Sequence, residues 1–279
     1  MMMMIFTILG FGLILNVYTF GTWLGTGTAI IVAALNIQFS PLMQQFWFSV
    51  FISGFTNEPT TAQVGENLRV WWAHYIGEHI SPSYLMQQTS MLSSISLLVA
   101  FTAFIGRVNL AQIIKITLFF TFFWNMTYFC LIRVYTIIAD FNDSVDSAEF
   151  SPRFFDYFGA SYVYLFGAFF GLVYSLMLVK QKFPLIHPSN EYNRISVVLS
   201  GVGTAFIFAT FIFTSNNFIT YPSGGRSIST LAIIFSLTGS VLGTYVGSAL
   251  AGKGKVGYKE ALVGTISGGV SLASVAPIL

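Results

Sequence analysis

The chain has 279 residues, of which 55% are hydrophobic and only 8% are charged, and its formal net charge is +2. Soluble domains carry about 25% charged residues, so this composition excludes an ordinary soluble protein. The small net charge gives no reason to expect nucleic-acid binding. Cys130 is the single cysteine, which excludes an internal disulfide.

Apolar segments follow one another along the whole chain, and we interpret each as a membrane-crossing α-helix. A helix needs about 20 apolar residues to cross a hydrocarbon layer of about 30 Å, whereas a β-barrel would show alternating segments of about 10 residues. The predicted fold class is therefore an all-α polytopic membrane protein, a single integral domain with eight helices. The predicted spans are 2–21, 24–52, 85–106, 110–138, 159–180, 195–219, 227–250 and 259–277.

The basic residues predict the orientation of these spans. Eight of the twelve Lys and Arg residues flank the links between spans three and four, five and six, and seven and eight. By the positive-inside rule these links face the cytoplasm or its equivalent, and both termini face the other side. The outer loop 53–84 contains Trp71 and Trp72. It is expected to hold either an interfacial amphipathic helix or a loop helix packed on the protein.

The side chains that carry most catalytic and metal chemistry avoid the spans. His74, His79 and His187 all lie in connecting loops, and the first two are five residues apart, so they do not form an i, i+4 metal pair. The spans contain no Ser–His–Asp set, phosphate-binding loop or pair of carboxylates. We therefore expect no enzyme activity, no metal site and no cofactor.

Motifs in a shared order connect the chain to a known family. Residues 166–172 read FGAFFGL, and further motifs lie at 33–48, 106–112, 248–255 and 267–270. These segments are similar, in the same order, to segments of the Rh branch of the ammonium transporter family. The resemblance implies the family's bundle, which is built from two inverted five-helix repeats with a pore between them and assembles as trimers. Against eleven core helices, eight spans imply a truncated bundle with a complete first repeat and a partial second repeat.

The resemblance also assigns positions to the family's functional residues. Tyr164 stands where the family has its first pore histidine, and the second pore histidine belongs to a helix beyond the eighth. The family's gating phenylalanine falls near Thr214 or Ser215. Its structural aspartate matches Asp156, although the position of Asp156 before an apolar run favours an N-cap of span five. Histidine titrates near neutral pH, whereas a phenol has a pKa near ~10, so these pore-equivalent positions are degenerate.

Two further expectations concern packing. The former pore is expected to be closed around Tyr164, with Phe166, Phe169 and neighbouring phenylalanines packed into it. Small residues let membrane helices approach closely, and we assign structural roles to a set of glycines on that ground or from the FGAFFGL motif. These glycines are Gly167, Gly171, Gly243, Gly247 and Gly268.

The missing pore pair favours a degenerate pseudo-channel that serves as a structural, supernumerary subunit of a larger membrane complex. Its expected partners are other membrane-protein subunits and lipid, and its expected location is a respiratory assembly of the mitochondrial inner membrane. The alternative is a channel for ammonia or another small neutral gas, with the plasma membrane as its alternative location. Ammonia is an expected partner under that alternative alone.

Overall fold

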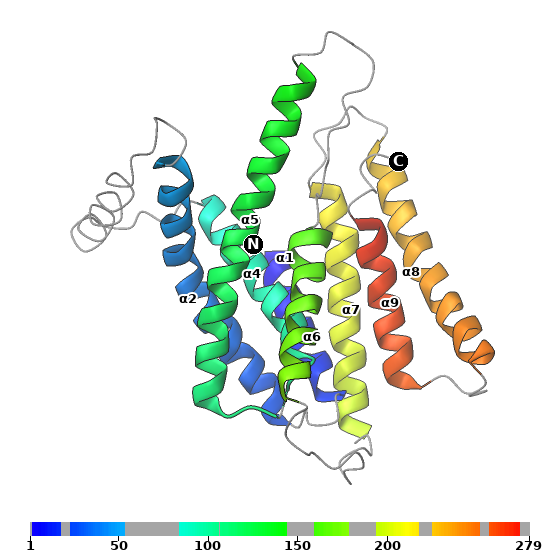
Figure 1. Cartoon of the computed structure of the whole chain (residues 1–279). Coiled ribbons are helices and arrows are strands. Elements are labelled where there is room, and N and C mark those ends of the chain that lie inside the picture. The colour runs from blue at the N-terminus through cyan, green and yellow to red at the C-terminus, as the bar shows by residue number, and fades with distance from the viewer. Residues whose placement is uncertain are drawn as a thin grey trace.

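A computed structural model describes residues 2–17, 23–53, 84–105, 107–143, 159–178, 194–217, 225–251 and 257–273. These residues form eight α-helices, with no β-strand among them, so the predicted all-α class is confirmed (Figure 1). The helices are α1 (Met2–Ile14), α2 (Trp23–Ser53), α4 (Tyr84–Phe101), α5 (Leu110–Asp143), α6 (Phe166–Leu178), α7 (Arg194–Asn217), α8 (Gly225–Leu250) and α9 (Tyr258–Ala273). A 3₁₀ turn, η1 (Leu15–Val17), extends α1, and a π-helix, η2 (Ala160–Leu165), leads into α6.

Successive helices run in alternating directions across the bundle, so the beginning of α1 and the end of α9 lie on the same side (Figure 1). This agrees with the predicted topology, and each predicted span overlaps one of these helices. The outer loop predicted at 53–84 lies almost wholly outside the described residues, since α2 ends at Ser53 and α4 begins at Tyr84. The charge-based orientation remains a prediction.

Five of the described helical stretches are long and apolar enough to cross a membrane, which is fewer than the eight predicted spans. They are Gly25–Trp47, Ala111–Leu131, Ala160–Leu178, Arg194–Ile212 and Leu231–Leu250. The apolar part of α1, Met4–Val17, is shorter, and α9 has 16 residues. The chain is therefore an integral membrane protein in which several helices have less than the length or hydropathy expected of a lone span.

The helix α4 falls outside those five because it lies in the middle of the bundle rather than against lipid. It packs on α1, α2, α5 and α6. Its buried serines are fully covered by those neighbours: Ser90, Ser93, Ser94 and Ser96. A helix that other helices surround can carry hydroxyls, because interhelical and intrahelical hydrogen bonds satisfy them.

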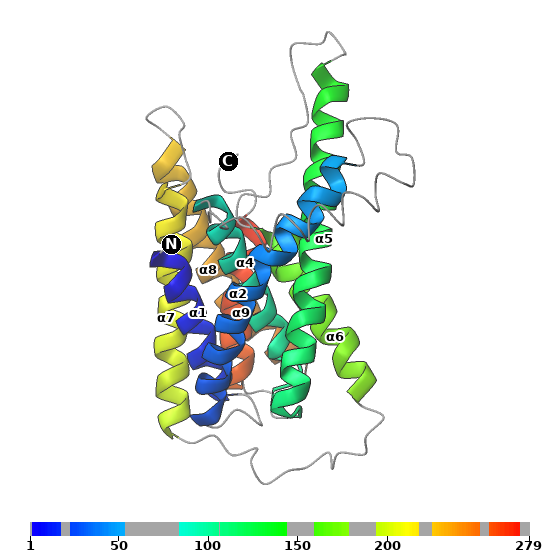
Figure 2. The ribbon, with the colours of Figure 1, turned by 90° about the vertical axis from the view of Figure 1, so that its left-hand side faces the viewer.

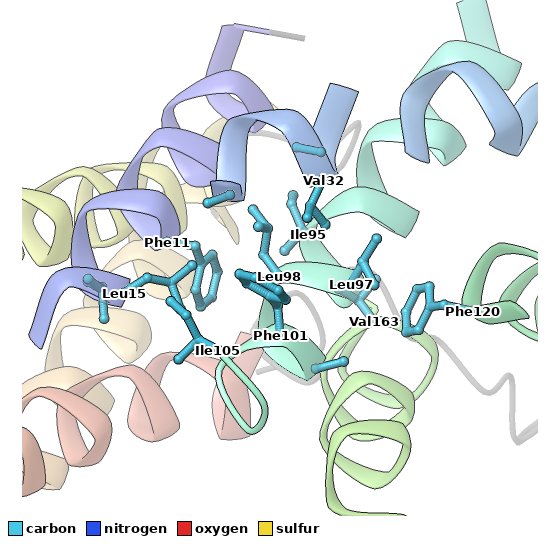
Figure 3. Packing of buried hydrophobic residues seen from close by; sticks show 14 of the residues in the cluster. Phe11, Leu15, Val32, Ile95, Leu97, Leu98, Phe101, Ile105, Phe120 and Val163 are labelled. Carbon is cyan, nitrogen blue, oxygen red and sulfur yellow. The ribbon is translucent and has the colours of Figure 1, made fainter. Parts of the chain in front are cut away.

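The hydrophobic core lies where α1, α2, α4, α5 and η2 meet (Figure 3). Leu98 and Phe101 of α4 lie at its centre, with Phe11 of α1 on one side and Phe120 of α5 on the other. Phe101 and Phe104 pack edge to face, with ring centroids 5.3 Å apart. Aromatic pairs in this geometry are worth more than the area that they bury, which gives the high phenylalanine content of the chain a packing role.

A crossing of two glycines joins α1 to α7, which lie side by side in Figure 2. A Cβ atom on Gly10 would lie 2.8 Å from the carbonyl oxygen of Gly203, and one on Gly203 would lie 2.6 Å from the carbonyl oxygen of Gly10. The contact is thus nearly reciprocal. Because α1 and α7 are the first helices of the two repeats implied by the resemblance, this crossing lies where a pseudo-two-fold axis would relate them.

Candidate functional site

The site that contains Tyr164 begins at a glycine with a left-handed backbone. Gly159 has a φ of 69°, the left-handed conformation that glycine adopts readily. A Cβ atom there would also lie 2.6 Å from Val163 Cγ2. The backbone N–H of Tyr164 donates to the carbonyl of Gly159 at 3.3 Å, a bond that spans five residues. This widened turn is η2, and π-helical turns frequently occur at functional sites.

Side chains from two neighbouring helices hold the carbonyls of this widened turn. The Ser96 hydroxyl of α4 donates to the carbonyl of Val163 at 2.6 Å. The Trp124 indole N–H of α5 donates to the carbonyl of Tyr162 at 2.8 Å. Both donors belong to residues that are almost completely buried. The π-helix is therefore fixed from the core side, and this fixes the direction in which Tyr164 leaves the backbone.

Below the π-helix, α6 lies directly against the backbone of α4. A Cβ atom on Gly167 would collide with the carbonyl oxygen of Ser96, and one on Gly171 would lie 2.8 Å from the carbonyl oxygen of Ala100. Both glycines are buried at this crossing. The two glycines of the FGAFFGL motif thus allow two backbones to touch.

A groove of about 590 Å³ lies beside η2 and is lined by residues of α1, α4, η2, α6 and α9. Its apolar lining comes mainly from Phe11, Val99, Ala168, Val263, Ile266 and Val270. Hydroxyls of Thr102, Ser267 and Ser271 also line it, and each donates to a carbonyl of its own helix, at 2.7 Å, 2.7 Å and 2.9 Å. Their oxygen lone pairs remain able to accept a hydrogen bond from a molecule in the groove.

Tyr164 is half-buried and lines this groove. Its ring packs against Phe211 of α7, with centroids 6.3 Å apart and planes tilted by 31°. Phe211 in turn contacts α9, because a Cβ atom on Gly269 would lie 2.8 Å from its ring. The Tyr164 hydroxyl makes no hydrogen bond to another described residue. A small molecule in the groove could therefore meet a free O–H donor in an apolar environment.

The expectation that Phe166 and Phe169 fill the former pore is wrong. Phe166 packs away from the groove, against Phe120 at 5.5 Å and Phe170 at 6.3 Å between centroids. Phe169 is 59% exposed on the outer face of α6. The physical reason is the glycine crossing, since turning Gly167 and Gly171 toward α4 fixes the helix rotation. The phenylalanines then point toward α5 or outward.

The structure does not describe the side chains at the other positions that the resemblance assigns to functional residues. Thr214 and Ser215 belong to the last turn of α7, and their side chains lie outside the described residues. Asp156 and the three histidines also lie outside them. The resemblance would put a gating phenylalanine near Thr214 or Ser215 at the end of α7. The buried aromatic residue that packs against Tyr164 is instead Phe211, about one turn earlier on α7.

The glycines of the last two helices fall into two groups. Gly268 of α9 is buried against α8, where a Cβ atom would lie 2.7 Å from the carbonyl oxygen of Ser236. Gly243 and Gly247 of α8 are exposed, and a Cβ atom on either would meet no described atom within 4 Å. They form part of an open glycine stripe, Gly239, Gly243 and Gly247.

Sequence reasoning missed the donors that shape the site. Ser96 and Trp124 were not singled out, because a serine and a tryptophan in apolar segments are common and carry no spacing that marks a pair. The sequence does contain a weak signal, because Gly159 directly precedes an apolar span and glycine readily adopts a left-handed backbone conformation. Ser96 and Trp124 donate to carbonyls of the π-helix η2, and no sequence pattern marks that π-helix.

The fold and the groove define a helical integral membrane protein with an apolar, hydroxyl-lined recess between its helices. No protein-family model matches the chain. Over 277 residues it is 25% identical to "Ammonium transporter Rh type C" of Gasterosteus aculeatus, a match that covers 97% of this chain and 47% of that protein. Over 275 residues it is 24% identical to the protein of the same name from Xenopus laevis, covering 97% and 48%.

The chain is therefore a distant homologue of the Rh-type ammonium transporters, as the motifs predicted. It spans about half the length of the curated relatives that it matches. Both relatives are transporters by name.

Proposed function

We propose that the Tyr164 groove forms one wall of a membrane path for ammonia or another small neutral gas. The observation that carries this proposal is Tyr164 itself, which lines the groove and whose hydroxyl has no hydrogen-bond partner among the described residues. Ammonia accepts a hydrogen bond through its lone pair and can donate to the hydroxyl oxygens of Thr102 and Ser271. The similarity to proteins named ammonium transporters supports the same choice of molecule.

The groove chemistry favours the neutral molecule over the ammonium ion. Among the described residues, no charged side chain is buried. A cation in such a place would lose its hydration without a compensating charge, which costs several kcal/mol or more. A phenol also offers no proton relay of the kind that a pair of imidazoles provides. The proton of an ammonium ion would therefore remain outside, and the neutral gas would cross.

Ammonia flux into liposomes that contain the purified chain tests this proposal. We expect internal alkalinisation faster than in empty vesicles after addition of an ammonium salt. Ala168→Phe should reduce the difference several-fold, because Ala168 lines the groove and a phenyl ring would fill it. Leu176→Phe is the matched control, since Leu176 is a 63% exposed residue of the same helix that does not line the groove. Flux equal to empty vesicles, or an equal effect of both variants, contradicts the gas path.

A second candidate function is a structural role inside a larger membrane assembly. The open glycine stripe on α8 supports it, because Gly239, Gly243 and Gly247 offer close approach to a helix that this chain does not supply among its described residues. The proposed partners are other membrane-protein subunits and lipid. A more specific version of this proposal assigns the chain to a mitochondrial respiratory complex, and that location stays a prediction.

Purification in a mild detergent separates the two candidates. The structural role predicts defined partner subunits that co-purify with the chain and are lost in Gly243→Leu, while the variant itself still inserts and folds. The gas path predicts flux from the chain alone. A homogeneous preparation without partners, together with unchanged behaviour of Gly243→Leu, would exclude the structural role.

A further inference from the structure

The Tyr164 groove is an open hollow rather than an enclosed cavity. Five of its lining residues are also exposed, which places them at its edges. One edge belongs to η2 and α6 and the other to α9, and these residues are Leu165, Ala168, Val263, Ser267 and Ser271. Leu165 is 55% exposed and Val263 is 51% exposed. The groove therefore opens to the outside of the bundle between two helices.

The edges run lengthwise along their helices. Val263, Ser267 and Ser271 recur every four positions, so they share one face of α9. Tyr164 and Ala168 repeat at the same interval on the other helix. From Val263 to Ser271 the edge is about 12 Å long, at 1.5 Å per residue. The groove is thus elongated in the direction of the helix axes.

The opening lies at the depth of the hydrocarbon layer. Leu165 and Ala168 belong to the apolar stretch Ala160–Leu178, which is long enough to cross a membrane, and both lie several residues from its ends. A stretch of this length covers a hydrocarbon layer of about 30 Å. Lipid chains, and not water, are therefore the medium that meets the opening.

The lining of the groove is compatible with hydrocarbon. Phe11 and Val99 form part of its deeper wall. At the edge, the hydroxyls of Ser267 and Ser271 already donate to carbonyls of their own helix, so an aliphatic chain beside them leaves no donor unpaired. An apolar hollow that stayed empty would also lose dispersion contacts on every wall. Filling the opening with hydrocarbon is therefore favourable.

We propose that one acyl chain of a membrane phospholipid lies lengthwise in this opening and closes the groove. The chain contacts Leu165 and Ala168 on one edge and Val263 on the other. Tyr164 is less exposed than these edge residues and packs on the buried Phe211 of α7, so it belongs to the deeper part. The lipid would supply the second wall of the gas path. That role rests on the proposed function, whereas the binding of the lipid does not.

The size of the groove and its surroundings favour a lipid chain over other occupants. A volume of about 590 Å³ along about 12 Å of helix corresponds to a width of about 8 Å, and a helix with its side chains is about 10–12 Å wide. A helix of a partner protein is therefore too wide. The outer face of α6 is apolar and exposed at Phe169, Leu172 and Leu176. The opening is thus continuous with a surface that lipid covers.

Native mass spectrometry of the chain, released from its membrane in a mild detergent, tests the proposal. We expect one phospholipid per chain to remain bound after detergent exchange. Val263→Trp and Ser267→Trp each place an indole ring in the opening, and each should lower the lipid-bound fraction several-fold. Leu176→Trp is the matched control, because Leu176 is 63% exposed on α6 and does not line the groove. It should retain the lipid.

Three outcomes would overturn the proposal. The first is a wild-type chain without bound phospholipid, and the second is an equal loss of lipid in Val263→Trp and Leu176→Trp. The third is a sterol, a quinone or a protein bound in place of the phospholipid. Melting temperatures near that of the wild type check that the tryptophan variants are folded, which is expected because both groove positions are exposed.

This experiment also separates the lipid from the gas path, since it uses no ammonia. A chain that retains phospholipid but gives no ammonia flux in liposomes contradicts the gas path alone. A chain that conducts ammonia but retains no phospholipid contradicts the lipid site alone.

Discussion

The first five predicted spans (α1, α2, α4, α5 and η2–α6) and the last three (α7, α8 and α9) use the same residue types in different ways. In the first set, Gly167 and Gly171 repeat at a four-residue interval and allow α6 to touch α4. In the last set, Gly239, Gly243 and Gly247 repeat at the same interval on α8 and touch no described atom. The first set surrounds α4, which contacts all of its members, while α8 lies at the edge and packs on α7 and α9.

The difference shows that a small-residue repeat permits close packing but does not by itself produce it. In a membrane, helix association depends on packing and interhelical hydrogen bonds, because lipid tails are as apolar as the helix faces. In the first set, hydrogen bonds such as those of Asn36, Ser96 and Trp124 join helices to one another. The hydrogen bonds of Ser236 and Ser240 join α8 to α9, and none of the three glycines of the stripe lies at that contact. Substitutions matched between the two sets can therefore break or sharpen the comparison.

The largest expected effect comes from glycine at a closed crossing. Gly167→Leu should destabilise the fold by about 3 kcal/mol or more, since its side chain would overlap the backbone of Ser96, which cannot move aside as a side chain would. Gly243→Leu should leave the melting temperature of the isolated chain nearly unchanged, because nothing lies near that position. Thermal unfolding in detergent measures both. Equal melting temperatures for the two variants would remove the distinction between the two sets.

An intermediate effect is expected from the asparagine that links three helices. Asn36→Leu should cost about 1–3 kcal/mol, because Thr121 and the serines of α4 lose a buried partner. Thr238→Val on α8 serves as the control, since its exposed hydroxyl bonds only to carbonyls of its own helix. Denaturant titration of both variants in the same detergent compares them. A tolerated Asn36→Leu would show that the polar contacts contribute little to the first set.

The smallest effect concerns the α8–α9 pair. The Ser236 hydroxyl donates to the carbonyl of Gly268 on the facing helix at 2.6 Å. Ser236→Ala should cost about 0.6 kcal/mol, the average for interhelical hydrogen bonds in a membrane protein. Ser267→Ala is matched to it, because that hydroxyl bonds within its own helix to Gly264, and it should have no measurable effect. A larger loss for Ser267→Ala than for Ser236→Ala would contradict the assigned contact.

Much of the fold could be predicted from the sequence because membrane helices are marked by the length of their apolar runs. The predicted starts of α4, α5 and α7 agree with the structure to within one residue. The relation to Rh-type proteins could be read from motif order. In the candidate site, the sequence predicted a pore closed around Tyr164 by Phe166 and Phe169, whereas Tyr164 lines a groove that neither phenylalanine lines.

The sequence by itself determined that this is an integral membrane protein and where its helices lie along the chain, because the length of a hydrophobic run is a local property. The order of its motifs likewise identified its distant family. Tertiary structure alone decided which face of each helix meets another helix. In α6 the collision of any Cβ atom at Gly167 with α4 sets the rotation of the helix, and that rotation opens the groove beside Tyr164. No sequence pattern could predict this, because in a membrane both the buried and the lipid-facing sides of a helix are apolar and no amphipathic signal separates them.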